Sequence, residues 1–244
     1  MPRLPVIYLA CRDIRDGEPH ATSGLAGLCA QLPVPGCILL LRPSLADSGI
    51  CLSYAAVPAE HEVALVQADR EALVIGNALQ RLGYPVEQAP AELGRVAQQT
   101  LRELFPAAAL AVIQLSLGTA LSDIQSRDLG ALLRPWLNQG WLALGLDSLA
   151  GEDAAAEGSR TSDLYWRQAL ASWIDEQVIQ SGPGALLNPQ SRAPYGGWLT
   201  ERDLASFRVL ESDIGLAGQR LPEQVASLAP GERCPPLSGY FWST

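Results

Sequence analysis

Five short and almost continuously apolar runs constrain the fold of this chain more than any other feature. They read VIYLA, GCILLLR, GICLSYAAV, LAVIQLSL and WLALGLDSL, and they cover residues 6–10, 36–42, 49–57, 110–117 and 141–149. Runs of this length without polar alternation predict strands that are covered on both faces, as in a sheet between two helical layers.

Segments with helical periodicity alternate with these runs, and we expect helices within residues 68–84, 93–106, 126–140, 161–182 and 199–218. Their ends carry capping signals: Asp69 and Ser126 as starts, Gly83 as a stop, and Thr200 with Asp203 as a capping box. The tail PPLSGYFWST predicts a last strand.

The alternation of strands and helices along the chain predicts an α/β fold with one domain over residues 1–244. We expect a three-layer sandwich whose central sheet is mostly parallel or mixed, with helices on both faces. The tryptophans of GGWL and YFW are expected in the core, an interface being the alternative.

Composition excludes several classes of partner. The net charge of −9 argues against nucleic acid and against anionic membrane surfaces, because both are bound by clustered cations. The five cysteines include no C-x-x-C pair, which predicts free thiols in a reducing compartment. With no signal peptide expected in the first residues and no apolar stretch long enough to span a bilayer, we expect a soluble, cytoplasmic protein.

The polar residues that follow the first strand raise the question of a site. Cys11, Arg12 and Asp13 lie where its carboxyl end should open, and α/β folds bind ligands at such ends. The chain has no glycine-rich phosphate loop, no G-x-S-x-G elbow and no H-E-x-x-H motif. Its two histidines, His20 and His61, lie in polar contexts that predict exposed loop or helix-start positions.

The order of several segments resembles the class III extradiol ring-cleaving dioxygenases, in particular the DOPA-dioxygenase-type (LigB-like) branch. The segments are LRELFPAAALAVIQLSL, RDLGALLRPWLNQGWLALGLDSLAG, YWRQALASWIDEQV, RAPYGGWLTERDLASFRVLESDIGLAG and LSGYFW, spread over nearly the whole chain. The resemblance implies the same sandwich fold and, in the family, a non-haem Fe(II) held by histidine and carboxylate ligands, with a further histidine for acid–base work on the catechol.

This chain lacks the histidines of the family motifs. Where the family has SHG, SAHW, DHG, THN and EHF, the sequence reads Ala10–Arg12, Arg42–Leu45, Ala91–Gly94, Leu149–Gly151 and Leu199–Glu201. The resemblance therefore implies a vacated metal site whose cleft is lined by Cys11, Arg12, Asp13, Arg42, Glu92, Asp147 and Glu201. Arg12 and Arg42 suit a carboxylate or phenolate ligand, or they pair internally with the acidic residues, the arrangement we favour.

Three functions follow as hypotheses. The first is a catalytically inactive homologue that acts as a partner or regulatory subunit of a metal-bearing dioxygenase chain, self-associates, or binds an aromatic small molecule, without a cofactor. The second is an active Fe(II) dioxygenase with relocated ligands, His20, His61 and a nearby Glu. The third is a metal-free binder or hydrolase that uses the same cleft, with Cys11 as nucleophile.

Overall fold

The computed structural model describes residues 5–10, 32–45, 49–58, 62–88, 93–147, 161–180, 186–225 and 239–243. The strands are β1 (Val6–Ala10), β2 (Cys37–Pro43), β3 (Ile50–Val57), β4 (Val86–Gln88), β5 (Leu110–Leu117), β6 (Trp141–Asp147), β7 (Glu223–Val225) and β8 (Gly239–Trp242). The helices are α2 (Glu62–Arg81), α3 (Arg95–Leu104), α4 (Asp123–Leu137), α5 (Thr161–Gln180), α6 (Pro189–Arg192), the 3-10 turn η2 (Gly196–Trp198) and α7 (Glu201–Ala217).

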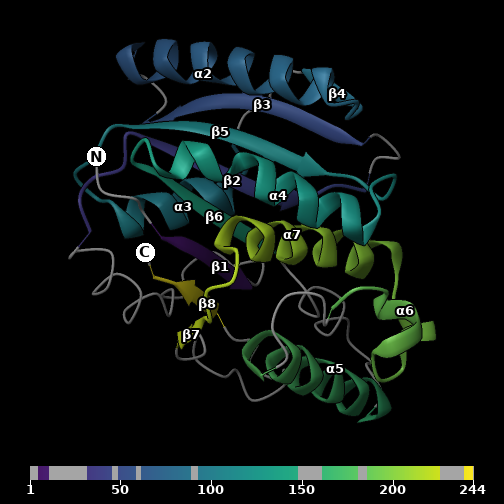
Figure 1. Ribbon diagram of the computed structural model, residues 1–244. Helices are drawn as coiled ribbons and strands as arrows, with labels where there is room; N and C mark the ends of the chain where they lie inside the picture. Colours follow the sequence, from purple (N-terminus) through teal and green to yellow (C-terminus); the bar gives the residue numbers. More distant parts are fainter. Residues whose placement is uncertain are drawn as a thin grey trace.

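The strands of the described part form one mixed sheet, in the order β4-β3-β5-β2-β6-β1-β8-β7. The central strands β1, β6, β2 and β5 are parallel, whereas β3 pairs antiparallel with β5 and β8 pairs antiparallel with β1. Figure 1 shows helices α2, α4 and α7 on one side of this sheet and α3 on the other. The predicted α/β sandwich with a mixed sheet and helices on both faces is confirmed.

Two buried layers of side chains hold the sheet between its helices. Along β1, Tyr8 points to the layer under α7, whereas Ile7 and Leu9 point to the layer under α3. The two layers arise because successive side chains of a strand point to opposite faces of the sheet. Since helices cover both faces, every position of β6 is buried. The continuous apolar runs of the sequence arise from this double coverage.

Helices α4 and α7 approach so closely that neither Gly130 nor Gly215 has room for a side chain. A Cβ at Gly130 would lie 1.9 Å from the backbone oxygen of Ser212, and one at Gly215 would lie 2.1 Å from the backbone oxygen of Arg127. The Ser212 hydroxyl donates a hydrogen bond of 2.9 Å to the backbone oxygen of Ser126 across the same contact. Small residues therefore fix the position of α7 over the sheet.

Two predicted helix starts are wrong. The helix expected from Asp69 begins at Glu62, because Ala64 and Ala68 continue its buried stripe by two turns toward the amino end. The helix expected from Ser126 begins at Asp123, where Ser122 and Gln125 form a capping box. The capping box of Thr200 and Asp203 at the start of α7 is confirmed.

Candidate functional site

The carboxyl ends of β1, β2 and β6 meet at one edge of the sheet. Ala10 lies opposite Asp147 in the β1–β6 register, and Leu41 lies opposite Gly145 in the β2–β6 register, so that Arg42 follows at the same edge. Two of the cleft residues predicted from the sequence, Arg42 and Asp147, are therefore brought to the same edge of the sheet.

Asp147 is the centre of a buried polar cluster at this edge. Its side chain is 4% exposed. The Tyr8 hydroxyl donates a hydrogen bond of 2.9 Å to Oδ2, and the Ser206 hydroxyl donates one of 2.5 Å to Oδ1. Burial, and then the charge of Asp147, raise the pKa of Tyr8 well above its usual value, so this phenol remains protonated as a donor.

A second carboxyl group, that of Asp213, lies in the same layer. It is fully buried, and neither of its oxygens has a hydrogen-bond partner among the described residues. Burial, and then the charge of Asp147, raise its pKa well above the usual range, which favours a neutral carboxylic acid. A Cβ at Gly145 would lie 1.8 Å from Oδ2 of Asp213, so only glycine leaves room for this group against the strand.

The cluster extends to α5 through the last strand. The ring of Tyr240 stacks on the ring of Tyr8 with a centroid distance of 5.9 Å. Its hydroxyl donates a hydrogen bond of 2.5 Å to Asp175 of α5. Burial, and then the charge of Asp175, raise the pKa of Tyr240. Strands β1 and β8 and helices α5 and α7 thus all contribute side chains to one set of buried polar groups.

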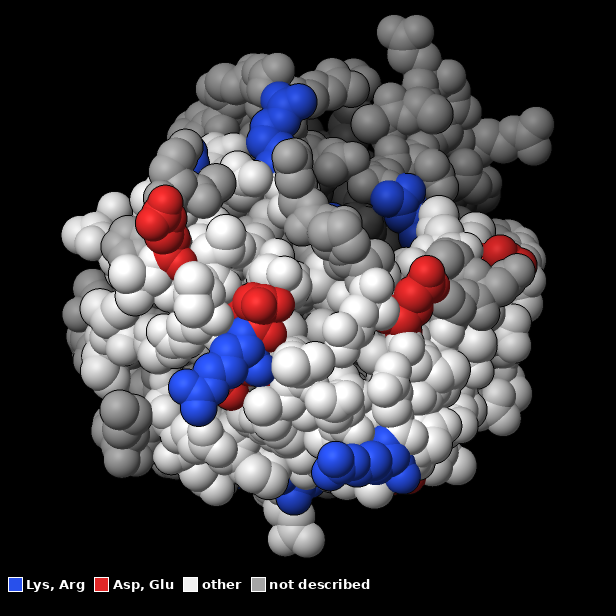
Figure 2. Space-filling model, turned by 90° about the horizontal axis from the view of Figure 1, so that it is seen from above, with Lys and Arg blue, Asp and Glu red and all other residues white. Residues whose placement is uncertain are grey.

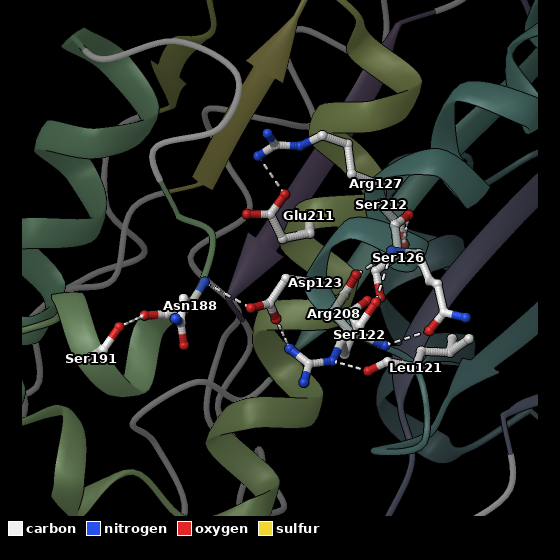
Figure 3. A network of polar contacts seen from close by, with 11 residues as sticks. Leu121, Ser122, Asp123, Ser126, Arg127, Asn188, Ser191, Arg208, Glu211 and Ser212 are labelled. Atoms are coloured by element: carbon white, nitrogen blue, oxygen red, sulfur yellow. Dashed lines mark hydrogen bonds and ion pairs between the residues drawn. The ribbon is translucent and has the colours of Figure 1, made fainter.

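Helix α7 is also fixed by an ionic network with α4, which Figure 3 shows. Arg208 forms an ion pair with Asp123, whose other carboxylate oxygen accepts a 2.7 Å hydrogen bond from the backbone N–H of Asn188. Arg127 and Glu211 form a second ion pair with an N–O distance of 2.5 Å. Glu211 is fully buried, and this burial raises its pKa to about 7 despite the opposing effect of Arg127.

The remaining predicted site residues differ in where they lie. The guanidinium of Arg42 rests against Gly94, whose added Cβ would be 2.9 Å from Nη1. Glu201 is exposed in the first turn of α7. The other residues of the predicted site lie outside the described residues; they are Cys11, Arg12, Asp13, His20, His61 and Glu92.

The described side chains at the strand ends lack the ligand set that the Fe(II) implied by the resemblance requires. Iron of this type takes histidine and carboxylate ligands with open coordination positions. Both oxygens of Asp147 already accept hydrogen bonds, and the side chain of Arg42 lies on the other face of the sheet, against Gly94. Within the described ranges there is no group of three or more His, Cys, Asp or Glu side chains that could hold a metal ion. The described strand ends therefore do not fit an iron site.

Sequence reasoning missed Tyr8, Ser206 and Asp213. The sequence holds two features that could have indicated them. Tyr8 is the polar side chain of an otherwise aliphatic strand, and Ser206 and Asp213 are polar residues seven positions apart on a buried helix. Seven residues are two helical turns, which places Ser206 and Asp213 on one face of α7. Nothing in the sequence indicated that this face lies on β6.

Charged side chains on the outer face over α2 form small separate groups. Figure 2 shows this face from above, with blue and red side chains adjacent in one group and white surface between the groups. Helix α2 also carries exposed apolar side chains; they are Val63, Leu65, Val66, Leu73 and Val74. None of the described helices is long and apolar enough to cross a membrane.

Comparisons with known proteins bear on the fold alone. No protein-family model and no curated protein matches the chain. Among solved structures, the chain is similar to the uncharacterized protein JW3007 from Escherichia coli K12, with a TM-score of 0.68 and 13% identity. The match covers 98% of this chain and 99% of the other, so the sandwich architecture is shared over nearly the full length.

Proposed function

We propose that this chain is a catalytically inactive homologue of the extradiol dioxygenases and acts as a partner or regulatory subunit for a related chain that carries the metal. The main support for the proposal is that both carboxylate oxygens of Asp147 accept hydrogen bonds from other side chains of the protein. At the edge where the resemblance places iron ligands, this carboxylate accepts hydrogen bonds from Tyr8 and Ser206 inside the protein. A carboxylate held in this way stabilises the packing of α7 on the sheet instead of facing a substrate.

The outer face of α2 is the surface that the proposal assigns to the partner. Its apolar side chains Val63, Val66, Leu73 and Val74 are each about half exposed or more. Contiguous exposed apolar surface of this kind is typical of protein–protein contacts. A homologous subunit is the occupant that the proposal names, because the resemblance implies a companion chain with the histidine motifs intact.

The test is co-expression with a chain from the same genome that retains the SHG and EHF motifs. The proposal expects the two chains to co-purify at a fixed ratio, and V66D together with L73D to abolish the complex while the chain stays folded. The matched control is R102E, a charge change on an exposed position of α3, on the other side of the sheet. A chain that remains separate from such a companion at micromolar concentration contradicts the proposal.

A further inference from the structure

A buried cation on α5 has no counter-ion in the described part of the chain. Arg167 is 9% exposed, and its Nε is buried without a hydrogen-bond partner. No described carboxylate forms an ion pair with it; its guanidinium carbon lies 4.8 Å from the ring centroid of Trp166. A buried charge without a partner is unfavourable, and in a chain of net charge −9 carboxylates are plentiful. Among the described residues, Arg167 therefore has an aromatic contact but no negative charge beside it.

Two exposed aromatic rings adjoin the buried tryptophan that this cation contacts. Trp166 makes an edge-to-face contact with Trp198 at a centroid distance of 6.3 Å, and Trp198 lies 5.2 Å from the ring of Tyr195. Trp198 is 56% exposed and Tyr195 is 51% exposed, so part of each ring is open to solvent. The core position expected for the tryptophan of GGWL is therefore wrong, whereas Trp242 of YFW is buried as expected.

The segment that carries these rings is held firmly. A Cβ at Gly196 would lie 2.3 Å from the backbone oxygen of Gln190, so η2 is in direct contact with the backbone of α6. The backbone N–H of Asn188, next to α6, is hydrogen-bonded to Asp123 of α4. The exposed rings are thus presented on a supported surface, which lowers the entropic cost of binding a flat ligand.

We infer that Arg167, Trp166, Trp198 and Tyr195 form a binding site for a small molecule that joins an anionic group to a flat aromatic ring. The guanidinium offers a planar fork of N–H donors that matches a carboxylate or a phosphate group. The open faces of Trp198 and Tyr195 offer stacking surface for the ring. Because Arg167 is nine-tenths buried, only a small anionic group reaches it, which favours a small molecule over a protein surface.

This site is separate from the cluster around Asp147 and does not depend on the proposed function. It has no residue in common with the Tyr8, Ser206 and Asp213 set. Its ligand would contact α5 and the segment before α7, and would supply the negative charge that Arg167 lacks within the described structure.

Isothermal titration with three naphthalene probes tests the inference. 2-Naphthoate and 2-naphthyl phosphate carry the two candidate anionic groups, and 2-naphthamide is the neutral analogue. We expect at least one anion to bind at least tenfold more tightly than the amide, and the tighter anion identifies the ligand class. R167M should abolish this preference, R167K should reduce it, and W198A should weaken all binding tenfold or more.

Matched controls and a folding readout make the result decisive. Y165A removes an exposed tyrosine of α5 that is outside the ring cluster, and R81M removes an exposed arginine of α2; both should bind as the wild type does. R167M should also raise the melting temperature, because it removes a buried charge that no described carboxylate pairs with. Absence of saturable anion binding to the wild type at millimolar concentration, or an anion preference retained in folded R167M, overturns the inference. Neither result bears on co-purification with a companion chain.

Discussion

Glu211 should make the stability of this protein fall as the pH rises from about 5 to 8. Its folded-state pKa of about 7 lies above the ordinary value of 4.5, because burial disfavours the charged form. Between these values the folded state binds a proton that the unfolded state has released, so the free energy of unfolding decreases with pH. The contribution is complete below pH 4.5 and is lost as the pH passes through 7. At about 1.4 kcal/mol for each pKa unit, the change is about 3 kcal/mol.

The variant E211Q isolates this effect. Glutamine resembles the protonated glutamic acid but does not titrate, so the variant should lose the pH dependence that Glu211 contributes. Measured by urea unfolding at a series of pH values, the stability of E211Q relative to the wild type should rise by about 3 kcal/mol between pH 5 and pH 8. Asp213, whose pKa is also raised, contributes with the same sign in both proteins and cancels in the difference.

The matched control is E176Q, because Glu176 lies exposed on α5. The difference in free energy of unfolding between E176Q and the wild type should change little between pH 5 and pH 8. If the difference in free energy of unfolding between E211Q and the wild type stays constant over that range, Glu211 does not have a raised pKa in the folded state. A difference of opposite sign would mean that the ion pair with Arg127 outweighs the cost of burying Glu211.

Three further changes test the packing and the polar contacts. G145A should destabilise by about 1–3 kcal/mol, because the added methyl group collides with the Asp213 carboxyl; thermal unfolding equal to the wild type would contradict this. G130A should cost a similar amount, about 1–3 kcal/mol, by separating α4 from α7; the measurement is urea unfolding, with an unchanged midpoint as the contrary result. Y240F should cost about 1 kcal/mol through the lost hydrogen bond to Asp175, and Y195F, an exposed position, should cost almost nothing in the same assay.

The parts of the fold that depend on local pattern were predictable from the sequence. Strand β5 has the predicted bounds, because a continuous apolar run between turns determines a strand covered on both faces. The capping box of Thr200 and Asp203 was predicted because its residues are three positions apart. The start of α2 was missed because Asp69 has the chemistry of a cap, although the stripe of alanines from Ala64 continues past it.

The parts that depend on contacts between distant segments were not predictable. Tyr8 and Asp147 are 139 positions apart, and Ser206 and Asp147 are 59 apart. Asp147 and Arg42 were indicated by the family resemblance, which places the cleft at strand ends that are visible in the sequence. The partners of Asp147 come from the interior of β1 and of α7, and only the packing of α7 over β6 brings them to it. The burial of Arg167 against Trp166, near the exposed ring of Trp198, is likewise a tertiary property that no motif records.

Metal analysis of the purified chain tests directly whether this chain lacks the iron site of the family that it resembles. The chain is loaded anaerobically with Fe(II), desalted and measured by elemental analysis, with the H20A and H61A variants treated in the same way. We expect no stoichiometric iron in any of the three proteins, because the strand-end carboxylate is hydrogen-bonded to Tyr8 and Ser206. One tightly held iron for each wild-type chain, lost in either histidine variant, would contradict this expectation and show that relocated histidine ligands hold a metal.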